Sequence, residues 1–470
     1  MIALKVVAQM SRTCGLAFVL LGAMAASTAS SAQTLTSLTS FNGIDGAIPN
    51  AGLIADAYGN LFGTTLEGGA YGFGTVFEIV KTTSGYASAP TVLASFSGGD
   101  GGAYPRGGLL ADANGNLFGT TGGGGTTAYG AVFEILKTTN GYAGIPIVLA
   151  SFSGDDGAFP VSSLLSDANG NLIGTTEEGG SSNSGTVFEI TKTATGYSST
   201  PTVLVSFNGN DGFFPIAGLI ADASGNLFGT TVLGGTSNAG TVYEVVKTSS
   251  GYASTPTVLA NFSTGASNAY PYGGLLADAK GDLFGTSMEG GPYAAGVAFE
   301  IPKTTSGYGV PTTLLSFNDA DGAFPWASLI ADADNNLFGT TAGGGTNSDG
   351  TVFEIAFTAT GYATAPATVA NLDAVNGTNS YGSLIADANG NLFGTASNGG
   401  AYGEGTVFEV IGSGFVPPTL FAGTPGSANC AGVSISTLAH TYGGIAHAAA
   451  SLGYASVADL QNAAATYCGN

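Results

Sequence analysis

Carboxylates recur along this chain with a regular spacing. An Asp opens the phrase DAxGN seven times, and a Glu closes the phrase VFE seven times, each with small variations. An acid that recurs in every copy serves a shared scaffold rather than one reaction, and an Asp just before a Gly turn can accept backbone N–H bonds. We therefore expect each Asp to hold a tight hairpin, and each Glu to bond to a neighbouring repeat or to the Lys three residues on. The residues are Asp56, Asp112, Asp167, Asp222, Asp278, Asp332 and Asp387, with Glu78, Glu134, Glu189, Glu244, Glu300, Glu354 and Glu409.

The repeats contain no His and no Cys, so no residue within them can provide imidazole or thiol catalysis. Both histidines, His440 and His447, follow the repeats, as do Cys430 and Cys468, while Cys14 precedes them. A Ser-His-Asp triad or a Cys nucleophile within the repeats is therefore excluded. Three functions remain open: a ligand-binding or adhesive module, a metal-assisted hydrolase or lyase, and a structural component of the cell envelope. We favour the binding module.

Four short strands are expected in each repeat. A phrase ending in Phe or Leu recurs every 55 or 56 residues, and GLIADA and NLFGTT meet across a Gly-containing turn, which is a hairpin signal. GTVFEI and TVLASF add two further β-branched and aromatic runs, so we label the four segments A, B, C and D in this order. The recurring residues are Phe41, Phe96, Phe152, Phe207, Phe262, Phe317 and Leu372.

The phase of the repeats predicts how the fold closes. TLTSLTSF near residue 33 is a D segment, whereas the last repeat ends on the C segment GTVFEVI, so the first segment supplies what the last repeat lacks. Joining them removes the exposed edges of a linear stack. The sequence therefore predicts an all-β fold, a seven-bladed β-propeller of four-stranded blades over residues 33–412, closed by an N-terminal outer strand.

The repeat resembles the GloVer tandem repeat of secreted bacterial proteins, and more loosely the kelch and NHL propeller repeats. The likeness rests on GSLIADANGNLFGTASNGG and its six cousins and covers about residues 34–411. It implies export and a propeller-like fold, and the family carries no assigned reaction. The chain departs from the usual C-terminal anchoring segments of that family, because no apolar helix followed by basic residues is present.

Acidic residues fall in the D-to-A and B-to-C loops, which are expected to share one face of a propeller. Arg106 is the one cation among these loops, whereas six lysines fall on the opposite face, so we expect a strongly acidic loop face. Clustered carboxylates beside Gly-rich backbone suit Ca²⁺, although no EF-hand loop is present and no cofactor is required. The alternative is that these acids maintain solubility and form turns. The candidate metal ligands are Asp45, Asp100, Asp156, Asp211 and Asp321.

The position after the Pro of each D-to-A loop differs between repeats, and specific function should lie where the copies differ. Aromatic faces beside polar side chains suit the stacking of sugar rings or other flat ligands. We expect a carbohydrate or small-molecule site here, at the mouth of the central channel; the alternative is that these side chains only fill that mouth. The candidate ligand-binding residues are Asn50, Arg106, Tyr272, Trp326 and Tyr381, with Val161 and Ile216 at the two intervening positions.

The two ends of the chain differ from the repeats. Residues 1–32 read as a cleavable signal peptide, since Lys5 and Arg12 precede a short apolar run that ends in small residues. Residues 413–428 read as a linker, and 429–470 as a small unit of two or three short helices. In an exported protein Cys430 and Cys468, which bracket this unit, are most simply a disulfide.

Composition limits the partners. Acidic residues outnumber basic ones by 31 to nine, which makes nucleic acid and anionic membrane surfaces poor partners. No segment after the signal peptide is apolar enough to span a membrane. We expect a secreted monomer, located outside the cell, in the periplasm or at the cell surface, that binds a small-molecule, glycan or protein ligand on its acidic loop face.

Overall fold

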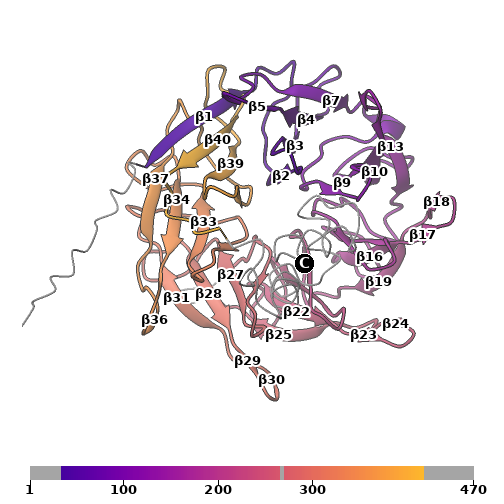
Figure 1. The fold of residues 1–470 in the computed structure, drawn as a ribbon. Helices are drawn as coiled ribbons and strands as arrows, with labels where there is room; N and C mark the ends of the chain where they lie inside the picture. Colours follow the sequence, from indigo (N-terminus) through magenta and orange to yellow (C-terminus); the bar gives the residue numbers. More distant parts are fainter. Residues whose placement is uncertain (1–32, 265–268, 418–470) are drawn as a thin grey trace, which may run out of the picture. The chain divides into compact units, whose positions relative to one another are not determined.

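A computed structural model describes residues 33–264 and 269–417. These residues form seven four-stranded antiparallel sheets, each made of A, B, C and D strands in that order across the sheet. The sheets follow one another around a ring, as the colour sequence in Figure 1 shows. The prediction of an all-β, seven-bladed propeller with four-stranded blades is confirmed.

The strands are short, as the sequence phrases suggested. The A strands contain only two residues: β2 (Ile54–Ala55), β8 (Leu110–Ala111), β14 (Leu165–Ser166), β20 (Ile220–Ala221), β26 (Leu276–Ala277), β32 (Ile330–Ala331) and β38 (Ile385–Ala386). The B strands are β3 (Leu61–Thr65), β9 (Leu117–Thr121), β15 (Leu172–Thr176), β21 (Leu227–Thr231), β27 (Leu283–Ser287), β33 (Leu337–Thr341) and β39 (Leu392–Ala396). The C strands are β4 (Thr75–Ile79), β10 (Ala131–Ile135), β16 (Thr186–Ile190), β22 (Thr241–Val245), β28 (Val297–Ile301), β34 (Thr351–Ile355) and β40 (Thr406–Ile411). The D strands are β1 (Thr34–Ser40), β7 (Thr91–Ser95), β13 (Ile147–Ser151), β19 (Thr202–Ser206), β25 (Thr257–Asn261), β31 (Thr312–Ser316) and β37 (Ala367–Asn371).

The ring closes between the first and the last strand. β1 pairs antiparallel with β40, from Thr34 opposite Ile411 to Ser40 opposite Thr406. The seventh blade therefore takes its D strand from the start of the chain, as predicted. Side chains from both ends also share one apolar cluster, in which Phe41 and Phe77 pack with Phe393.

A circle of threonine hydrogen bonds joins every blade to the next. The first Thr of the GTT phrase on each B strand donates its hydroxyl to a backbone carbonyl at the start of the following blade, over 2.9 to 3.4 Å. The last of these bonds runs from Thr395 to the carbonyl of Ala51, across the junction of the seventh and first blades. The circle is complete, so all seven blade interfaces are equivalent in this respect.

The Gly of each B strand makes room for the aromatic residue of the C strand beside it. A Cβ atom on Gly63 would lie 2.6 Å from Cζ of Phe77, and the same crowding recurs in the other six blades. The Phe77 ring is fully buried and meets Phe41 edge to face at 4.9 Å. Gly is therefore required at this position by packing alone.

The C-to-D connections form small hairpins. Within each hairpin a Lys-Thr or Phe-Thr pair bonds to a Gly-Tyr pair, and the Tyr packs on the preceding blade, as Tyr86 does on Phe393 at 5.4 Å. The hairpins are β5–β6 (Lys81–Thr82, Gly85–Tyr86), β11–β12 (Lys137–Thr138, Gly141–Tyr142), β17–β18 (Lys192–Thr193, Gly196–Tyr197), β23–β24 (Lys247–Thr248, Gly251–Tyr252), β29–β30 (Lys303–Thr304, Gly307–Tyr308) and β35–β36 (Phe357–Thr358, Gly361–Tyr362).

The seventh blade has no such hairpin, since its D strand comes from the other end of the chain. The segment after β40 takes its place on the sixth blade. Phe415 packs on Phe338 at 5.1 Å, and the Val416 N–H donates to Asp332. Residues 413–417, predicted to begin a linker, thus lie against the propeller.

The DAxGN phrase forms the turn that its residue types predicted. Asp56 accepts the N–H groups of Tyr58 and Asn60 on one carboxylate oxygen, and the Asn60 amide on the other. The corresponding Asp accepts the same two backbone N–H groups in every other blade. The structural role expected for these acids is confirmed.

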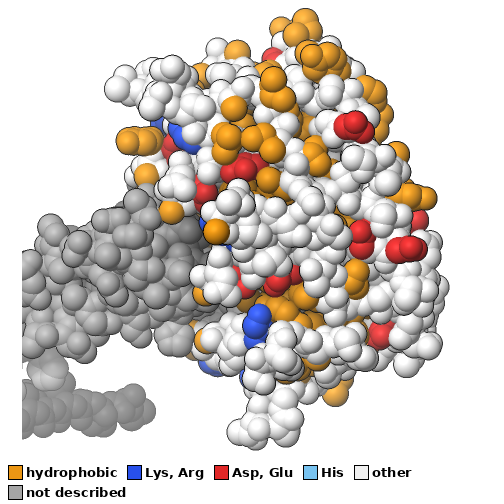
Figure 2. All heavy atoms as spheres, turned by 90° about the vertical axis from the view of Figure 1, so that its right-hand side faces the viewer, with side chains coloured by type: hydrophobic (Ala, Val, Ile, Leu, Met, Phe, Trp, Pro, Cys, Tyr) orange, Lys and Arg blue, Asp and Glu red, His pale blue; other side chains and the backbone are white. Residues whose placement is uncertain are grey.

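Several expectations fall outside the described residues. These are the signal peptide, the helical unit with its Cys430–Cys468 disulfide, and both histidines. Among residues 33–264 and 269–417 the one helical element is the 3-10 turn η1 (Gly99–Gly101), and no helix there has the length and apolarity to cross a membrane. Figure 2 shows the edge of the ring, where charged side chains are scattered between uncharged ones.

Candidate functional site

The loop before the variable position has the same strained backbone in all seven blades. The residue just before the Pro, or before Ser380 in the seventh blade, has a φ between 57 and 59°. This region is unusual for residues with a side chain, above all for the β-branched Ile48. Two hydrogen bonds hold the conformation, since the Ile48 N–H donates to Glu404 O in the preceding blade and its carbonyl accepts from Leu66 N. The strain recurs in every blade, so it belongs to the scaffold and fixes where the variable side chains lie.

Three of the predicted ligand-binding residues form one aromatic group, which we call the aromatic arc: Tyr272, Trp326 and Tyr381. The Tyr272 and Trp326 rings lie 3.9 Å apart between centroids at an interplanar angle of 32°. Tyr381 meets Trp326 edge to face at 5.1 Å. All three side chains are half-buried, so part of each ring faces solvent.

The two polar candidates have other contacts. Asn50 accepts a short hydrogen bond from the Ser397 hydroxyl of the seventh blade. Arg106 is exposed, and its charge acts on Glu177 of the third blade. No ring contact or hydrogen bond joins either residue to the aromatic arc within the described part of the chain.

A cavity of about 310 Å³ adjoins the arc. Tyr272 belongs to both, and the wall is largely apolar. Glu177 is its one charged side chain. The lining residues are Glu177, Phe214, Ile216, Val232, Leu233, Tyr270, Tyr272 and Met288.

Burial changes the acid–base chemistry of this cavity. It raises the pKa of Glu177; the Arg106 charge opposes the shift, and the Glu178 charge adds to it. The pKa of Tyr272 is also raised, by burial first and then by the nearby charges of Glu177 and Glu289. A carboxyl that holds its proton to higher pH beside an apolar wall can donate a hydrogen bond to a ligand.

Sequence reasoning missed Glu177, although a signal was present. The residue after the GTT phrase is Leu66, Gly122, Val232, Met288, Ala342 or Ser397 in the other six blades, so Glu177 is the one acid at this position. Of the other lining residues, Tyr272 was already a candidate and Ile216 lies at the same variable position. The rest are apolar side chains whose types do not distinguish them: Phe214, Val232, Leu233, Tyr270 and Met288.

The five predicted metal ligands each lie in the D-to-A loop of a different blade. Asp45, Asp211 and Asp321 accept the N–H of the Asn three residues before them, and Asp156 accepts the N–H of Ser153. In the described residues, no three His, Cys, Asp or Glu side chains are grouped to hold a metal ion. The bonds that are present hold the acids within their own loops.

The six lysines share their face of the propeller with many acids. The face that carries the lysines also carries the Asp of every DAxGN turn and the Glu that ends every VFE phrase. Lys137 of the second blade acts on Glu78 of the first, and Lys303 of the fifth acts on Glu244 of the fourth. Glu134 and Glu409 follow the same rule, with Lys192 and Lys81 of the next blade. In these four blades the Glu is influenced by the Lys of the next blade and not by the Lys three residues on, which was one of the two alternatives.

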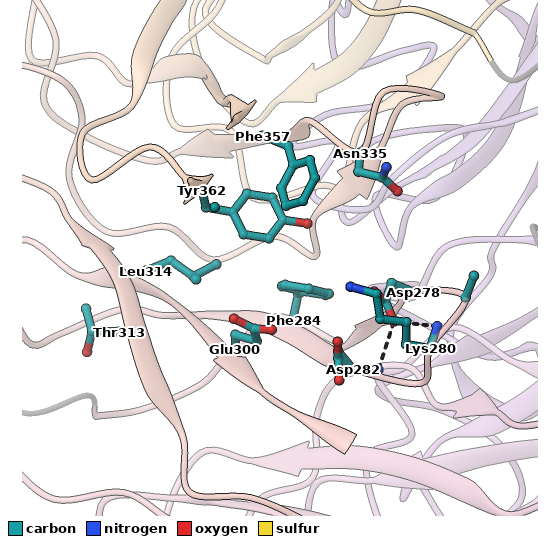
Figure 3. Close-up of a pocket in the computed structure, with 12 residues that line it drawn as sticks. Asp278, Lys280, Asp282, Phe284, Glu300, Thr313, Leu314, Asn335, Phe357 and Tyr362 are labelled. Atoms are coloured by element: carbon teal, nitrogen blue, oxygen red, sulfur yellow. Dashed lines mark hydrogen bonds between the residues drawn. The ribbon is translucent and has the colours of Figure 1, made fainter. Parts of the chain in front are cut away.

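A second cavity, of about 560 Å³, lies on this lysine-bearing face between the fifth and sixth blades. Asp278, Asp282 and Glu300 line it together with Phe357 and Tyr362 (Figure 3). It contains none of the residues that the sequence suggested as ligands.

A family model for the Gloeobacter/Verrucomicrobia repeat matches the chain three times, over residues 23–145, 91–262 and 246–454. The chain belongs to this repeat family. The resemblance to the GloVer repeat is thereby confirmed. Among curated proteins, none matches the chain in sequence.

Solved structures similar to this repeat protein include several enzymes. An ancestral GH74 enzyme has a TM-score of 0.51 at 13% identity, and the match covers 80% of this chain and 49% of that one. A gluconolactonase from Xanthomonas campestris has a TM-score of 0.40 at 12% identity, covering 80% and 89% of the two chains. A luciferin-regenerating enzyme has a TM-score of 0.37 at 13% identity, covering 70% and 95%. At these identities the likeness concerns the fold alone.

Proposed function

We propose that this protein is an exported ligand-binding propeller whose site is the aromatic arc with the adjoining cavity. The observation that carries the proposal is the contact between Tyr272, Trp326 and Tyr381, three aromatic side chains from successive blades that remain half-open to solvent. Four other blades place Asn, Arg, Val or Ile at the same position. A scaffold needs no such difference between its copies.

A sugar ring is the ligand class that this geometry fits best. Its C–H faces stack on exposed aromatic rings, and its hydroxyls need a small number of polar partners beside an apolar wall. Glu177 supplies a polar group at the wall of the cavity, and the charge of Arg106 acts on it. A cavity of about 310 Å³ is at the small end of ligand sites, which suits one or two rings rather than a long chain.

A glycan array with the mature protein tests the proposal. Wild type should bind a restricted set of glycans, and Trp326→Ala should lose that binding while it remains folded. Tyr58→Ala is the matched control, because Tyr58 is an 84% exposed aromatic on the opposite face and outside the site. Ca²⁺ should be present in one arm and chelated in another, so that a metal requirement is detected. Equal glycan binding by wild type and Trp326→Ala would rule the site out.

Glu177 is the observation that favours a second function, carboxylate acid–base catalysis in a hydrolase or lyase. A carboxyl with a raised pKa at the wall of a cavity is typical of a general acid. The bound glycan from the array decides between the two functions. A binding module returns it unchanged after prolonged incubation, whereas an enzyme releases product and loses that activity in Glu177→Gln.

A further inference from the structure

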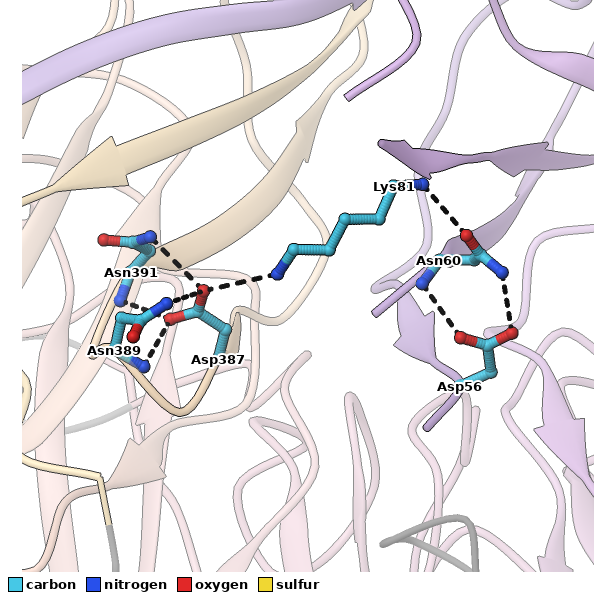
Figure 4. A network of polar contacts seen from close by, with 6 residues as sticks. All are labelled: Asp56, Asn60, Lys81, Asp387, Asn389 and Asn391. Carbon is cyan, nitrogen blue, oxygen red and sulfur yellow. Dashed lines mark hydrogen bonds and ion pairs between the residues drawn. The ribbon is translucent and has the colours of Figure 1, made fainter. Parts of the chain in front are cut away.

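Five propeller blades lean on the preceding one through a recurring contact, which we call the lysine slot. In each of the five, the Lys of the C-to-D hairpin lies over the Tyr of its own hairpin. In the first blade this Lys also reaches the DAxGN turn of the preceding blade. Lys81 Nζ lies 5.5 Å from the Tyr86 ring centroid and 3.9 Å from Oδ2 of Asp387, as Figure 4 shows for the ion pair. In four further slots the distance from Lys Nζ to the Tyr ring is between 3.8 and 5.8 Å.

In the lysine slot, a positive charge offsets the energetic cost of keeping a partly buried carboxylate ionised. Burial raises the pKa of Glu78, Glu134 and Glu244, and in each case the Lys of the next blade lowers it. An alkylammonium group beside a carboxylate and an aromatic ring is therefore the natural occupant of this slot.

The slot between the fifth and sixth blades departs from the pattern at two positions. Phe357 replaces the Lys, and its ring packs on Tyr362 at 4.9 Å. Asp282 replaces the Asn of the DAxGN turn. The slot has lost its cation and gained an anion.

Asp282 is left without the partner that an Asn would have. The side chain is 8% exposed, and one oxygen accepts the Lys303 N–H at 2.6 Å. In the first blade the amide of Asn60 fills the second position by donating to Asp56 Oδ2 at 2.8 Å. An ionised carboxylate has no proton to donate to Asp278, and no donor to its second oxygen is present among the described residues.

The neighbouring Lys280 offsets this charge only in part. It is exposed, and its backbone N–H completes the turn by donating to Asp278. Burial, Asp282 and Asp278 all raise the pKa of Glu300, and Lys280 opposes them. Three carboxylates thus face one ammonium, where a slot of the usual type has two carboxylates and one ammonium.

The vacated space is the cavity of about 560 Å³. Figure 3 shows Asp282 and Glu300 on one side of it, Phe357 and Tyr362 on the other, and Phe284 between them. The acids of this slot are not grouped as a metal site, since no three His, Cys, Asp or Glu side chains of the described residues are placed to hold a metal ion together.

We propose that the slot between the fifth and sixth blades binds a primary alkylammonium group from outside the propeller, the chemistry of a lysine side chain or an aliphatic diamine. The ammonium occupies the place that Lys81, Lys137, Lys192, Lys247 and Lys303 occupy in the other slots. It donates to Asp282 and Glu300, while its methylene chain lies along the rings of Phe357 and Tyr362. This site is separate from the aromatic arc, which lies on the opposite face.

Calorimetric titration tests the proposal with two probes, 1,5-diaminopentane and N-acetyl-lysine methylamide. Both should bind wild type, and the more tightly bound one identifies the source of the amine. 1-Pentanol, of similar length and without charge, should not bind. Phe357→Lys restores the usual slot and should abolish binding of both amines. Asp282→Asn should weaken it at least tenfold.

Two controls separate a specific site from general attraction of amines to an acidic protein. Val375→Lys adds the same charge at a 72% exposed position on the opposite face, and it should leave amine binding unchanged. Lys137→Phe with Asn60→Asp reproduces the two replacements in the slot between the first and second blades, and it should add a second binding site.

Three results would overturn the proposal. One is equal binding by wild type and Phe357→Lys, and another is equal loss in Val375→Lys and Phe357→Lys. The third is binding that appears only in Lys280→Ala, which would show that Lys280 is the resident cation of a purely structural slot. The thermal unfolding of every variant is measured alongside, so that a loss of fold is separated from a loss of binding.

Discussion

Removing one hydroxyl tests whether the propeller is a closed ring. Thr395→Val deletes the hydrogen bond from the last blade to the carbonyl of Ala51 in the first, which is 2.9 Å long. Thr120→Val deletes the equivalent bond to Ser162 O, also 2.9 Å long, between two blades that are consecutive in the chain. Valine keeps the shape of threonine, and both threonines and both acceptor residues are buried. Each change leaves a buried carbonyl without this donor, which costs about 1–3 kcal/mol.

In a closed ring the two substitutions lower the free energy of unfolding by similar amounts. Guanidinium unfolding followed by far-UV circular dichroism measures both, with Thr395→Ser and Thr120→Ser as controls that keep the hydroxyl. If the junction of the seventh and first blades is open in solution, Thr395→Val changes the free energy by less than about 0.5 kcal/mol, as a surface substitution does. That result, together with a full loss in Thr120→Val, would refute the closure.

Three further predictions concern stability. Gly63→Ala should lower it by about 1–3 kcal/mol, measured by denaturant unfolding, because the new Cβ lies 2.6 Å from the Phe77 ring; an unchanged midpoint would contradict the packing argument. Phe415→Ala should cost about 3 kcal/mol and open residues 413–417 to proteolysis, whereas wild-type resistance in the variant would show that this segment is not docked. Stability should also rise as the pH falls from 7 towards the unfolded-state pKa of Glu, about 4.3. Burial raises the folded-state pKa of six Glu residues, so the folded state binds more protons than the unfolded state in this range. The six are Glu78, Glu134, Glu244, Glu300, Glu354 and Glu409. Thermal unfolding at a series of pH values measures this, and a melting temperature that falls steadily from pH 7 to 5 would contradict it.

Most of the fold could be predicted from the repeat. Seven copies of four β-type segments, with a D segment first and a C segment last, predicted the blades and the closure that β1 and β40 make. The structural role of Asp56 and its counterparts also followed from residue type and position alone, because an Asp before a Gly turn acts on its own backbone. Such features depend on contacts that are local in sequence or repeated from copy to copy.

Contacts between blades could not be predicted from the sequence in the same way. The Thr395 bond joins residues 344 apart, and nothing in the GTT phrase indicates that its first hydroxyl points to the next blade. The partner of Glu78 is Lys137 and not Lys81, because the hairpin leans on the preceding blade. For the same reason the sequence did not reveal the slot at Phe357 and Asp282. Both residues visibly depart from the repeat, but they lie on neighbouring blades and face each other only across the interface.

The candidate site was predicted in part. The variable position after the Pro indicated Tyr272, Trp326 and Tyr381, which the fold brings into contact. The same reasoning included Asn50, whose side chain bonds to Ser397, and it passed over Glu177. Position in a loop gives the face on which a residue lies, whereas its partners depend on loop conformations in the neighbouring blades.

Fluorescence of Trp326 measures ligand binding at the aromatic arc most directly, because this residue is the single tryptophan of the chain. The glycan that scores highest on the array is titrated into the mature protein, and the emission spectrum is followed. A ligand that stacks on the arc should shift or quench the emission in a saturable way, with a dissociation constant equal to that from calorimetry. Calorimetric binding of the same glycan with no change in Trp326 emission would contradict the central claim, since the ligand would then bind elsewhere on the propeller.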